Sequence, residues 1–459
     1  MAGADLVLGI DSSTQSTKAL LIDATDGSLV ATGSAPHPAG TAVDPRAWLT
    51  AVDTATHELL DRASAAAVGG QQHGMVALDA AGDPVHDALL WNDTRSAPQA
   101  TALIEELGGP DACARTIGSV LVASFTSTKL RWLRDHESDA AARTTQVLLP
   151  HDYVSRHLSG GEVFTDRGDA SGTGYWSTAD DRWLPALAEQ AIGHDIALPR
   201  IVASSQIAAT APSGLILGAG TGDNAAAALG LDLQPGDVVI SIGTSGVASA
   251  ISTVPVADGT GSVTGFADAT THFLPLVATI NAARILELQC RLLGVDHDEL
   301  ARLALAAPAG ANGLTILPYY DGERTPNRPD ATGTWSGLTT STTREDLARA
   351  AVEALLCSLA DAVDHLTAAT GAAPRRLLMI GGAARNEAVR TIAPAVLGRP
   401  VTIPESGEYV ARGAARQAAW ALSGTAAPPS WPELPSRTFQ AEPTPDVREA
   451  YARLREDTA

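Results

Sequence analysis

A turn rich in hydroxyl groups follows an aspartate near the start of the chain. The apolar residues 6–10 end at Asp11, and serine, threonine and glutamine occupy every position from 12 to 17. The amides and hydroxyls of such a turn, Ser13 and Thr14 among them, can hold phosphate oxygens, while the carboxylate reaches a magnesium ion through its water shell. An ordinary β-hairpin turn has the same composition, so both interpretations stay open at this point.

A second turn of this kind occurs halfway along the chain. Residues 237–252, DVVISIGTSGVASAIS, echo residues 5–20, DLVLGIDSSTQSTKAL. We expect Gly243 and Thr244 to grip the same phosphate chain, although any two strands share part of this likeness. A P-loop is excluded, because Lys18 and Lys129 are the only lysines and neither follows a glycine.

An aspartate opens a third segment, GTGDNAAAALG. Asp223 follows a buried strand and stands where a helix is expected to begin. One interpretation makes it an N-cap whose carboxylate accepts bonds from backbone amides. The other makes it the general base that accepts the proton of an acceptor hydroxyl during phosphoryl transfer.

Two further segments carry side chains suited to a neutral, many-hydroxyl ligand. GGQQHGMVALD places Gln72 and His73 on a glycine-flanked turn, and LLWNDTR contains Trp91 and Asp93. Amide, imidazole, indole and carboxylate groups together bind sugars, but a solvated turn has the same residue types.

A glycine turn follows a predicted buried strand at residues 377–380. Gly381 and Gly382 leave room for a flat ring beside the backbone, and Asn386 begins the next helix, where it can bond a nucleoside. A lone pair of glycines is a weak signal of a ligand.

The elements that must position these residues alternate strands and helices. The expected strands of the first meander are residues 6–10, 18–22 and 28–32, and the expected helices are residues 45–64, 129–137, 281–293, 344–370 and 447–455. The proline-rich residues 425–446 are predicted to form an irregular surface arm. The second meander places the domain boundary before Asp237, giving domains 1–236 and 237–459.

Composition limits the function classes. The 459 residues are 45% hydrophobic and 18% charged, as in a globular chain with sizeable cores. The net charge of -21 argues against nucleic acid or anionic membranes as partners. Three cysteines without metal-ligand spacing fit a reducing cytoplasm.

A family resemblance runs through nearly the whole chain. It is carried by GIDSSTQSTKALLID, GGQQHGMVALD, LLWNDTR, SFTSTKLRWLRDHE, LLPHDYVSRHLSGG, TDRGDASGT, GTGDNAAAALG, ISIGTSG, LPYYDGERTPNRP and IGGAARN. In this order the segments resemble the FGGY family of carbohydrate kinases. The resemblance implies an α/β fold of two actin-like ATPase (ribonuclease H-like) domains flanking a central cleft, with the sugar bound mainly by the first domain and Mg²⁺·ATP mainly by the second.

The resemblance also implies roles for the residues in these segments. Asp223 would be the catalytic base, and Asp11 would lie with Thr14 at the metal and phosphate site. The sugar-binding residues it implies are Gln72, His73 and Asn224, with Trp91, Asp93 and Ser124 nearby. The nucleotide-binding residues it implies are Ser13, Thr14, Gly243, Thr244, Glu287, Gly381, Gly382 and Asn386.

The resemblance implies that the acceptor is a ketopentose, and D-xylulose is the ketopentose it favours. Gln72 and His73 stand where glycerol-phosphorylating members have an Arg-Glu pair, which argues against glycerol. The xylulose-phosphorylating members more often have methionine at the position of Gln72, so D-ribulose, L-xylulose and xylitol remain alternatives. GERTP, residues 322–326, belongs to the family pattern, but the sequence offers no physical account of its role.

Two other function classes compete with a sugar kinase. A non-catalytic sugar sensor would need a DNA-binding segment, and an ATPase that acts on protein clients would need a client-binding module; neither is visible in the sequence. The partners expected are therefore a small sugar and ATP. Relatives commonly form dimers, which makes a homodimer one possible assembly, but the sequence itself does not give the oligomeric state.

Overall fold

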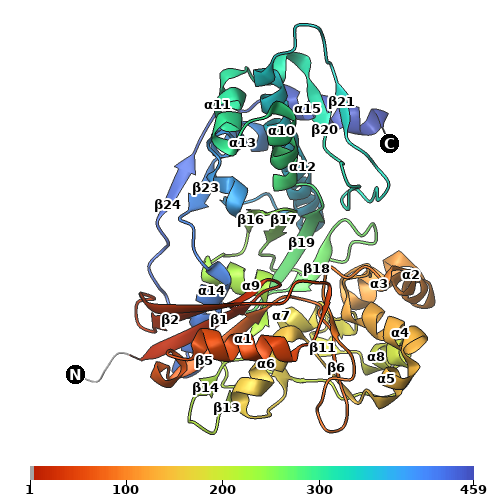
Figure 1. The fold of residues 1–459 in the computed structure, drawn as a ribbon, viewed down its shortest axis with the longest axis vertical. Coiled ribbons are helices and arrows are strands. Elements are labelled where there is room, and N and C mark those ends of the chain that lie inside the picture. Colours follow the sequence, from red (N-terminus) through yellow and green to blue (C-terminus); the bar gives the residue numbers. More distant parts are fainter. Residues whose placement is uncertain (1–4, 459) are drawn as a thin grey trace. The chain divides into compact units, whose positions relative to one another are not determined.

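The computed structural model describes residues 5–458 and contains two compact units (Figure 1). Unit 1 comprises Met1–Leu233, Thr253–Leu274 and Gly407–Glu433. Unit 2 comprises Gln234–Ser252, Pro275–Ser406 and Leu434–Ala459. The chain thus passes between the units several times, and the domain boundary expected at residues 236/237 stays a prediction.

Unit 1 is built on a mixed sheet in the order β13-β14-β5-β1-β2-β3, with β15 also paired to β5. Its strands are β1 (Leu6–Ser12), β2 (Ser16–Asp23), β3 (Leu29–Pro36), β5 (Ala65–Gly70), β13 (Ala209–Thr210), β14 (Ile216–Leu217) and β15 (Thr221–Gly222). β1 pairs antiparallel with β2 and parallel with β5, and β15 is also parallel to β5. Three strands therefore end at the same edge of the sheet.

The remaining elements of unit 1 are helices and short strands. The helices are α1 (Arg46–Thr56), η1 (Leu60–Arg62), α2 (Ala97–Glu106), α3 (Pro110–Ile117), α4 (Thr126–His136), α5 (Ser138–Arg143), α6 (Pro150–Ser159), α7 (Arg167–Ala170), α8 (Pro185–Ile192), α9 (Asp223–Gly230) and α14 (Tyr409–Ser423). The short strands are β4 (Ala42–Val43), β6 (Val76–Leu78), β7 (Ala88–Leu89), β8 (Gln146–Leu148), β9 (Phe164–Thr165), β10 (Trp176–Ser177), β11 (Arg182–Trp183), β12 (Arg200–Ile201) and β18 (Thr264–Ala267).

Both faces of the central sheet of unit 1 are buried. Leu8 and Ile10 belong to a core that includes residues of α1 and α6, whereas Val7 belongs to a core formed with the alanine-rich helix α14. This alternation follows from the two-residue period of a strand. α14 lies very close to the sheet, because a Cβ atom at Gly9 would be 1.8 Å from the carbonyl oxygen of Ala411.

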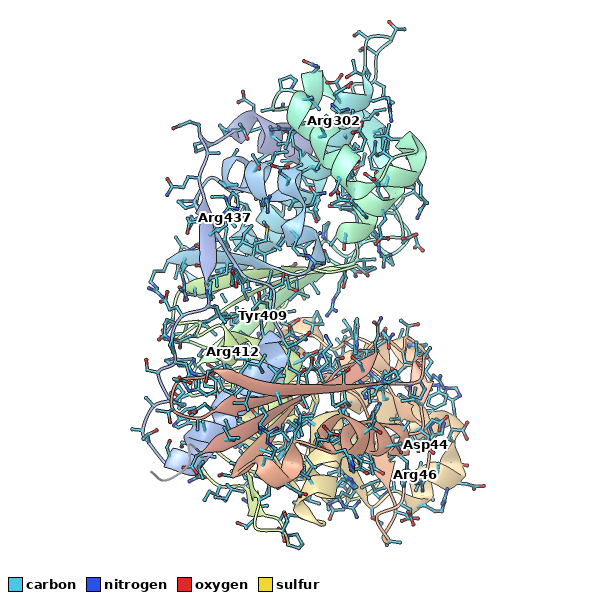
Figure 2. The ribbon with its side chains drawn as sticks, turned by 60° about the vertical axis from the view of Figure 1, so that its left-hand side comes forward. Asp44, Arg46, Arg302, Tyr409, Arg412 and Arg437 are labelled. Carbon is cyan, nitrogen blue, oxygen red and sulfur yellow. The ribbon has the colours of Figure 1, made fainter. Side chains whose placement is uncertain are left out.

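The start of α14 also packs tightly on the helix that carries Asp223. A Cβ atom at Gly413 would lie 1.8 Å from the carbonyl oxygen of Ala226 on α9. Tyr409 and Arg412 mark this end of α14 in Figure 2, and the Arg412 guanidinium carbon lies 5.1 Å from the ring centroid of Trp431. Glycine is needed at such contacts, since only a residue without a side chain admits two backbones this close. These contacts leave no room for a side chain between α14 and α9.

Unit 2 repeats the strand arrangement of unit 1. Its strands follow the order β19-β17-β16-β22-β23-β24. β16 pairs antiparallel with β17 and parallel with β22, just as β1 pairs with β2 and β5. The bounds are β16 (Asp237–Ile242), β17 (Gly246–Ala250), β19 (Phe273–Thr279), β20 (Thr315–Leu317), β21 (Thr334–Ser336), β22 (Arg376–Ile380), β23 (Val401–Pro404) and β24 (Ser436–Phe439). The internal copy predicted from residue 237 is confirmed.

The helices of unit 2 are dominated by one long buried helix. They are α10 (Ala283–Leu293), α11 (His297–Ala306), η2 (Ala311–Gly313), α12 (Arg344–Thr370), η3 (Gly382–Arg385), α13 (Glu387–Leu397) and α15 (Pro445–Asp457). α12 begins at a capping box in which Thr343 accepts a bond from the amide of Asp346, and it ends at Gly371 with a φ of 67°. Its predicted bounds are confirmed. Among residues 5–458, none of the helices has the length and apolar character needed to cross a membrane.

Two predicted elements were wrong in part. The helix expected over residues 45–64 ends at Thr56 and is followed by the short helix η1, because its last residues turn before β5. The proline-rich residues 425–446 are not wholly irregular, since β24 pairs antiparallel with β23. β24 itself contains no proline, and its Thr438 and Phe439 favour a strand. The surrounding prolines had hidden this short segment.

Candidate functional site

The candidate site of unit 1 lies where three parallel strands end. Asp11 on β1 and Thr221 on β15 both pair with Gly69 on β5, so the two outer strands flank the same point of the middle strand. Asp223 follows Thr221 by two residues and begins α9. Ligands of α/β sheets bind at such carboxyl edges, because the loops there leave a crevice.

Asp11 is a buried carboxylate, and one of its two oxygens lacks a hydrogen-bond partner among residues 5–458. It is 6% exposed, and among residues 5–458 its Oδ1 atom has no hydrogen-bond partner. Burial and, to a lesser extent, the negative charge of Asp223 raise the pKa of Asp11 to about 7, while Lys18 opposes the shift. Lys18 in turn forms a 2.8 Å ion pair with Glu408. A divalent cation would relieve both the unsatisfied oxygen and the repulsion, so the residues fit a magnesium site.

Asp223 is not the N-cap of its helix. The N-cap of α9 is Gly222, and Asp223 occupies the first helical position. Its Oδ1 accepts bonds from the backbone amide of Asn224 at 2.7 Å and from the Asn224 side-chain amide at 2.9 Å. In the described chain its Oδ2 has no hydrogen-bond partner and is free to accept one from a ligand. Burial raises the pKa of Asp223 to about 6, close to the range that suits a general base.

Gln72 lies beside this carboxylate. Its Oε1 accepts a 3.0 Å bond from the Asn224 side-chain amide, so Gln72, Asn224 and Asp223 form one hydrogen-bonded row. Gly222 makes the contact possible, because a Cβ atom there would lie 2.7 Å from Cγ of Gln72. Two predicted sugar-binding residues and the predicted base are thus adjacent.

His73 is held in an unusual backbone conformation. Its φ of 69° is in the left-handed region, which a histidine adopts only when its surroundings fix it. Nδ1 donates to the carbonyl oxygen of Gly172 at 2.7 Å, and the ring packs on Phe125 and Phe266 with centroid distances of 5.0 and 5.5 Å. The imidazole is therefore fixed in one orientation.

Trp91 and Thr14 form a second row beside the first. The indole Nε1 of Trp91 donates to Oγ1 of Thr14 at 2.9 Å, and the Thr14 hydroxyl is 3.5 Å from Oε1 of Gln71. Trp91 is 42% exposed, so its ring face is available to a ligand. Ser13 stabilises the turn itself, since its hydroxyl and amide both donate to the carbonyl of Ser16.

Asp93 and Ser124 lie near the Gln72–Asn224 row, but the Asp93 side chain is mostly occupied by contacts within the protein. The Asp93 carboxylate accepts bonds from Thr41 and from the backbone and side chain of Arg95, so most of its acceptor capacity is used internally. Ser124 precedes Phe125, the residue that packs on His73. Ser124 is thereby near the row, whereas the Asp93 side chain supports the loop that carries Trp91.

Sequence reasoning missed a buried lysine behind Ser124. Lys129 on α4 is fully buried, and its amine donates to the carbonyls of Ala123, at 2.9 Å, and Ser124. Burial lowers the pKa of Lys129 to about 7, against the opposing charge of Asp93. A lysine among the apolar positions of a helix was the available signal. The amine fixes the loop that places Phe125 against His73.

The predicted phosphate turn of unit 2 joins β16 to β17. Gly243 donates from its amide to the carbonyl of Ser245 at 3.1 Å, and its own carbonyl accepts from Ala283 at the start of α10. Thr244 is exposed at the tip of the turn. Gly381 passes directly beside it, since a Cβ atom there would lie 2.6 Å from the carbonyl oxygen of Ile242. The two glycine turns therefore meet at one edge of this sheet.

The other predicted nucleotide residues lie on neighbouring elements of unit 2. Glu287 is exposed on α10, the helix whose start contacts the Gly243 turn. Gly382 faces open space, with no atom within 4 Å of a Cβ placed there. Asn386 is the N-cap of α13, accepting from the amides of Ala388 and Val389, and its side-chain amide also donates to the carbonyl of His297. Asn386 is therefore partly engaged by the fold.

The GERTP segment, residues 322–326, stabilises unit 2 through hydrogen bonds to neighbouring backbone groups. The Glu323 carboxylate accepts bonds from the backbone amides of Ile280 and Asn281 and from the Asn281 side chain. Thr325 donates to the carbonyl of Ala278 at 2.9 Å. These bonds fix the chain between β19 and α10. The segment thus positions the helix that carries Glu287.

Comparison with known proteins gives consistent matches. The N-terminal domain of the FGGY family of carbohydrate kinases matches residues 6–230, and the C-terminal domain of that family matches residues 238–422. A xylulose kinase of Streptomyces coelicolor is 46% identical over 91% of this chain and 88% of that protein, and one of Streptomyces rubiginosus is 44% identical over the same shares. The crystal structure of xylulose kinase from Bifidobacterium adolescentis superposes with a TM-score of 0.93 at 47% identity, covering 98% of this chain and 99% of that one.

Proposed function

Since the chain belongs to the FGGY family of carbohydrate kinases, with that family's two-domain, actin-like ATPase fold, we propose that it transfers the γ-phosphoryl group of ATP to a ketopentose, D-xylulose first. The names of the most similar relatives support this acceptor. The observation that carries the proposal is the pair of carboxylates, Asp11 and Asp223, at neighbouring strand ends beside the Gln72–Asn224 row.

Asp223 is the general base of the proposed reaction. As the terminal hydroxyl of the sugar, on C5 of a ketopentose, attacks the γ-phosphorus, Oδ2 of Asp223 accepts its proton. Two bonds from Asn224 hold Oδ1, so the carboxylate cannot rotate away from the acceptor. A pKa raised to about 6 leaves the group ionised at neutral pH and still basic enough to take a proton.

The nucleotide is the second substrate and arrives with magnesium. Asp11 would hold the ion through its unpartnered Oδ1, and Ser13 and Thr14 would face the phosphates. When bound, Mg²⁺ neutralises charge that develops on the transferred phosphoryl group. In unit 2, Gly243 and Thr244 would contact phosphate oxygens, while Glu287, Gly381, Gly382 and Asn386 would surround the nucleoside.

The sugar is bound by neutral polar groups and one ring. Gln72, His73 and Asn224 offer amide and imidazole groups to the hydroxyls, with Trp91 and Ser124 beside them. Asp93 has most of its acceptor sites filled by Thr41 and Arg95, so we assign it to support of the Trp91 loop rather than to a strong sugar bond.

A coupled assay of ADP release tests the proposed reaction. D-xylulose, L-xylulose, D-ribulose, L-ribulose, xylitol and glycerol are compared at one enzyme concentration, with and without Mg²⁺. We expect the highest kcat/KM with D-xylulose, and little ADP release without a sugar. A preference for glycerol or xylitol over every ketose would overturn the acceptor, and sugar-independent ADP release would overturn the kinase assignment.

A cytoplasmic location and a homodimer complete the proposal. The three cysteines, Cys113, Cys290 and Cys357, are all buried and unbridged, as suits a reducing compartment. The homodimer is proposed from the family resemblance alone. Both stay predictions, and light scattering of the purified chain measures the second.

A further inference from the structure

A histidine surrounded by aspartates is buried in unit 1, outside the site described above. His151 in the first turn of α6 has Nδ1 2.6 Å from Oδ2 of Asp169 and Nε2 3.1 Å from Oδ1 of Asp152. All three side chains are at most 1% exposed. A buried charge is costly unless it is paired, so the imidazole and its two carboxylates must be understood together.

This cluster lies directly against the strand ends that form the candidate site. A Cβ atom at Gly220 would be 2.5 Å from Cδ2 of His151, and one at Gly70 would be 2.8 Å from Cβ of His151. Gly220 leads through Thr221 to Asp223, and Gly70 leads to Gln72. The histidine therefore fills the space immediately behind the segments that carry the proposed base and its neighbour.

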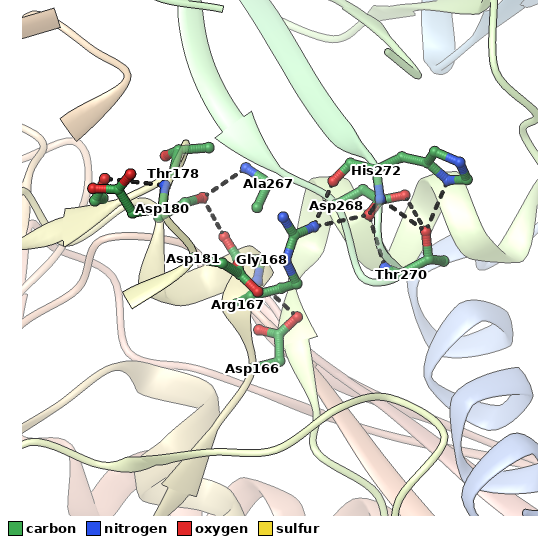
Figure 3. Close-up of polar contacts among 12 residues, drawn as sticks. Asp166, Arg167, Gly168, Thr178, Asp180, Asp181, Ala267, Asp268, Thr270 and His272 are labelled. Carbon is green, nitrogen blue, oxygen red and sulfur yellow. Dashed lines mark hydrogen bonds and ion pairs between the residues drawn. The ribbon is translucent and has the colours of Figure 1, made fainter. Parts of the chain in front are cut away.

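Asp166 and Arg167, at the start of the helix that carries Asp169, bind neighbouring segments, and Figure 3 shows polar contacts of both residues. Asp166 caps α7 by accepting from the amides of Gly168 and Asp169, and it also accepts a 2.7 Å bond from the hydroxyl of Thr221. Arg167 forms ion pairs with Asp181 at 2.7 Å and Asp268 at 3.4 Å. Asp169 thus has little freedom to move relative to β15.

The charges of the cluster do not balance. Three buried carboxyl groups, Asp152, Asp166 and Asp169, lie around one imidazole, while the charge of Arg167 is taken by Asp181 and Asp268. Burial raises the pKa of Asp152 to about 7 against the attraction of His151, so Asp152 carries only part of a negative charge at neutral pH. Burial disfavours the cation, but attraction to Asp152 and Asp169 outweighs it and raises the pKa of His151 to about 9. Burial raises the pKa of Asp169 to about 6 despite His151, and the charge of Asp223 contributes to that rise.

We propose that His151 and Asp169 are positioning residues that set the proton affinity of Asp223, with Asp169 favouring its protonated form and His151 limiting that effect. The inference rests on the proposed function, because it takes Asp223 as the general base. Neither side chain touches a substrate in this proposal. Both act through the charge and the packing that they place behind the ends of β5 and β15.

Other charged groups around Asp223 are shared by every variant considered below. The charge of Asp11 on β1 interacts with that of Asp223, and Lys18 and Glu408 act on Asp11 in turn. His73 lies three residues beyond the end of β5. α14 packs against α9, and its cations are engaged elsewhere: Arg412 bonds the carbonyl of Gly27, and Arg416 bonds the carbonyl of Leu229 and pairs with Asp232. These groups are the same in the wild type and in every variant, so a difference in the pH dependence of kcat/KM reports the substitution on α6 or α7.

The test is the pH dependence of kcat/KM for the ketose at saturating Mg²⁺·ATP. At an effective dielectric constant of about 20, a Coulomb interaction of about 1.4 kcal/mol between two charges shifts a pKa by about 1 unit. Asp169→Asn removes a negative charge, so we expect the acidic limb to move to lower pH by up to about 1 unit. His151→Gln removes the positive charge and should move the limb to higher pH. The double variant removes both charges and should return the limb close to wild type.

A matched pair of controls joins the same helix, α6, to α1. His157 on α6 forms a 2.8 Å pair with Asp53, and both side chains are substantially exposed. His157→Gln and Asp53→Asn should leave the limb in place. The inference is overturned if the two buried single variants give the wild-type limb, or if both move it in the same direction. Should His151→Gln fail to fold, Asp169→Asn decides alone, and a wild-type limb in that variant would overturn the inference.

The second readout is the pH dependence of the free energy of unfolding, which does not depend on activity. Because the pKa of His151 is raised from 6.5 to about 9 on folding, its charge contributes stability that is fully present below pH 6.5 and is lost as pH rises to 9. The wild type should lose stability over this interval, and the double variant should lose less of it. Equal slopes for the two proteins would contradict an ionised His151–Asp169 pair. Failure of the proposed function is separate, since it would appear as retained activity in Asp223→Asn.

Discussion

The replacement Asp223→Asn separates catalysis from stability. An amide oxygen can still accept both bonds from Asn224, so the geometry of the row is kept, but the amide cannot accept a proton. General-base catalysis is worth about 10² to 10⁴ in rate, and we expect kcat to fall by that factor. KM for the sugar should change little, because Gln72 and His73 remain.

The same replacement should make the protein more stable. Burial raises the pKa of Asp223 from 3.8 to about 6, so ionising it in the folded state costs about 2 to 3 kcal/mol at neutral pH. A neutral asparagine avoids this cost, and the gain should vanish below about pH 4, where the aspartate is protonated in both states. In a unit of this size the gain corresponds to a Tm rise of about 5 °C.

Thermal unfolding and the coupled ADP assay measure both effects on one preparation. Asp61→Asn, an exposed aspartate on η1, is the control and should change neither quantity. A variant with a near-normal rate would remove Asp223 from the role of base. A variant that loses both activity and stability would point instead to a structural role for the carboxylate.

Two further replacements test the surroundings of the base. Asp11→Asn should raise the Mg²⁺ concentration needed for half-maximal activity by about 10- to 100-fold. We also expect Mg²⁺ without nucleotide to raise the Tm of the wild type but not that of Asp11→Asn, and the same Mg²⁺ effect on both Tm values would refute the metal site. Lys129→Met removes the amine that holds the carbonyls of Ala123 and Ser124, so KM for the sugar should rise by about tenfold with KM for ATP unchanged. Equal changes in both KM values would show general loosening rather than a displaced sugar loop.

Local pattern was enough to predict many elements. The apolar spacing from Arg344, a capping Thr343 and the stop at Gly371 gave the bounds of α12, because these signals act within a few residues. The echo between residues 5–20 and 237–252 gave the repeated strand pairing for the same reason. β24 was missed because its strand pairing with β23 depends on a partner more than thirty residues away.

The sequence by itself determined which residues could do chemistry, and tertiary structure decided what surrounds them. Asp11, Asp223 and Gln72 stand out by residue type, yet only the pairing of β1 and β15 with β5 brings them together. The cluster of His151 and Asp169 was invisible as a unit, since α6 and α7 are separate in sequence and meet only behind the sheet. Proton affinity depends on burial and on charges within several ångströms, and those are set by the folded chain as a whole.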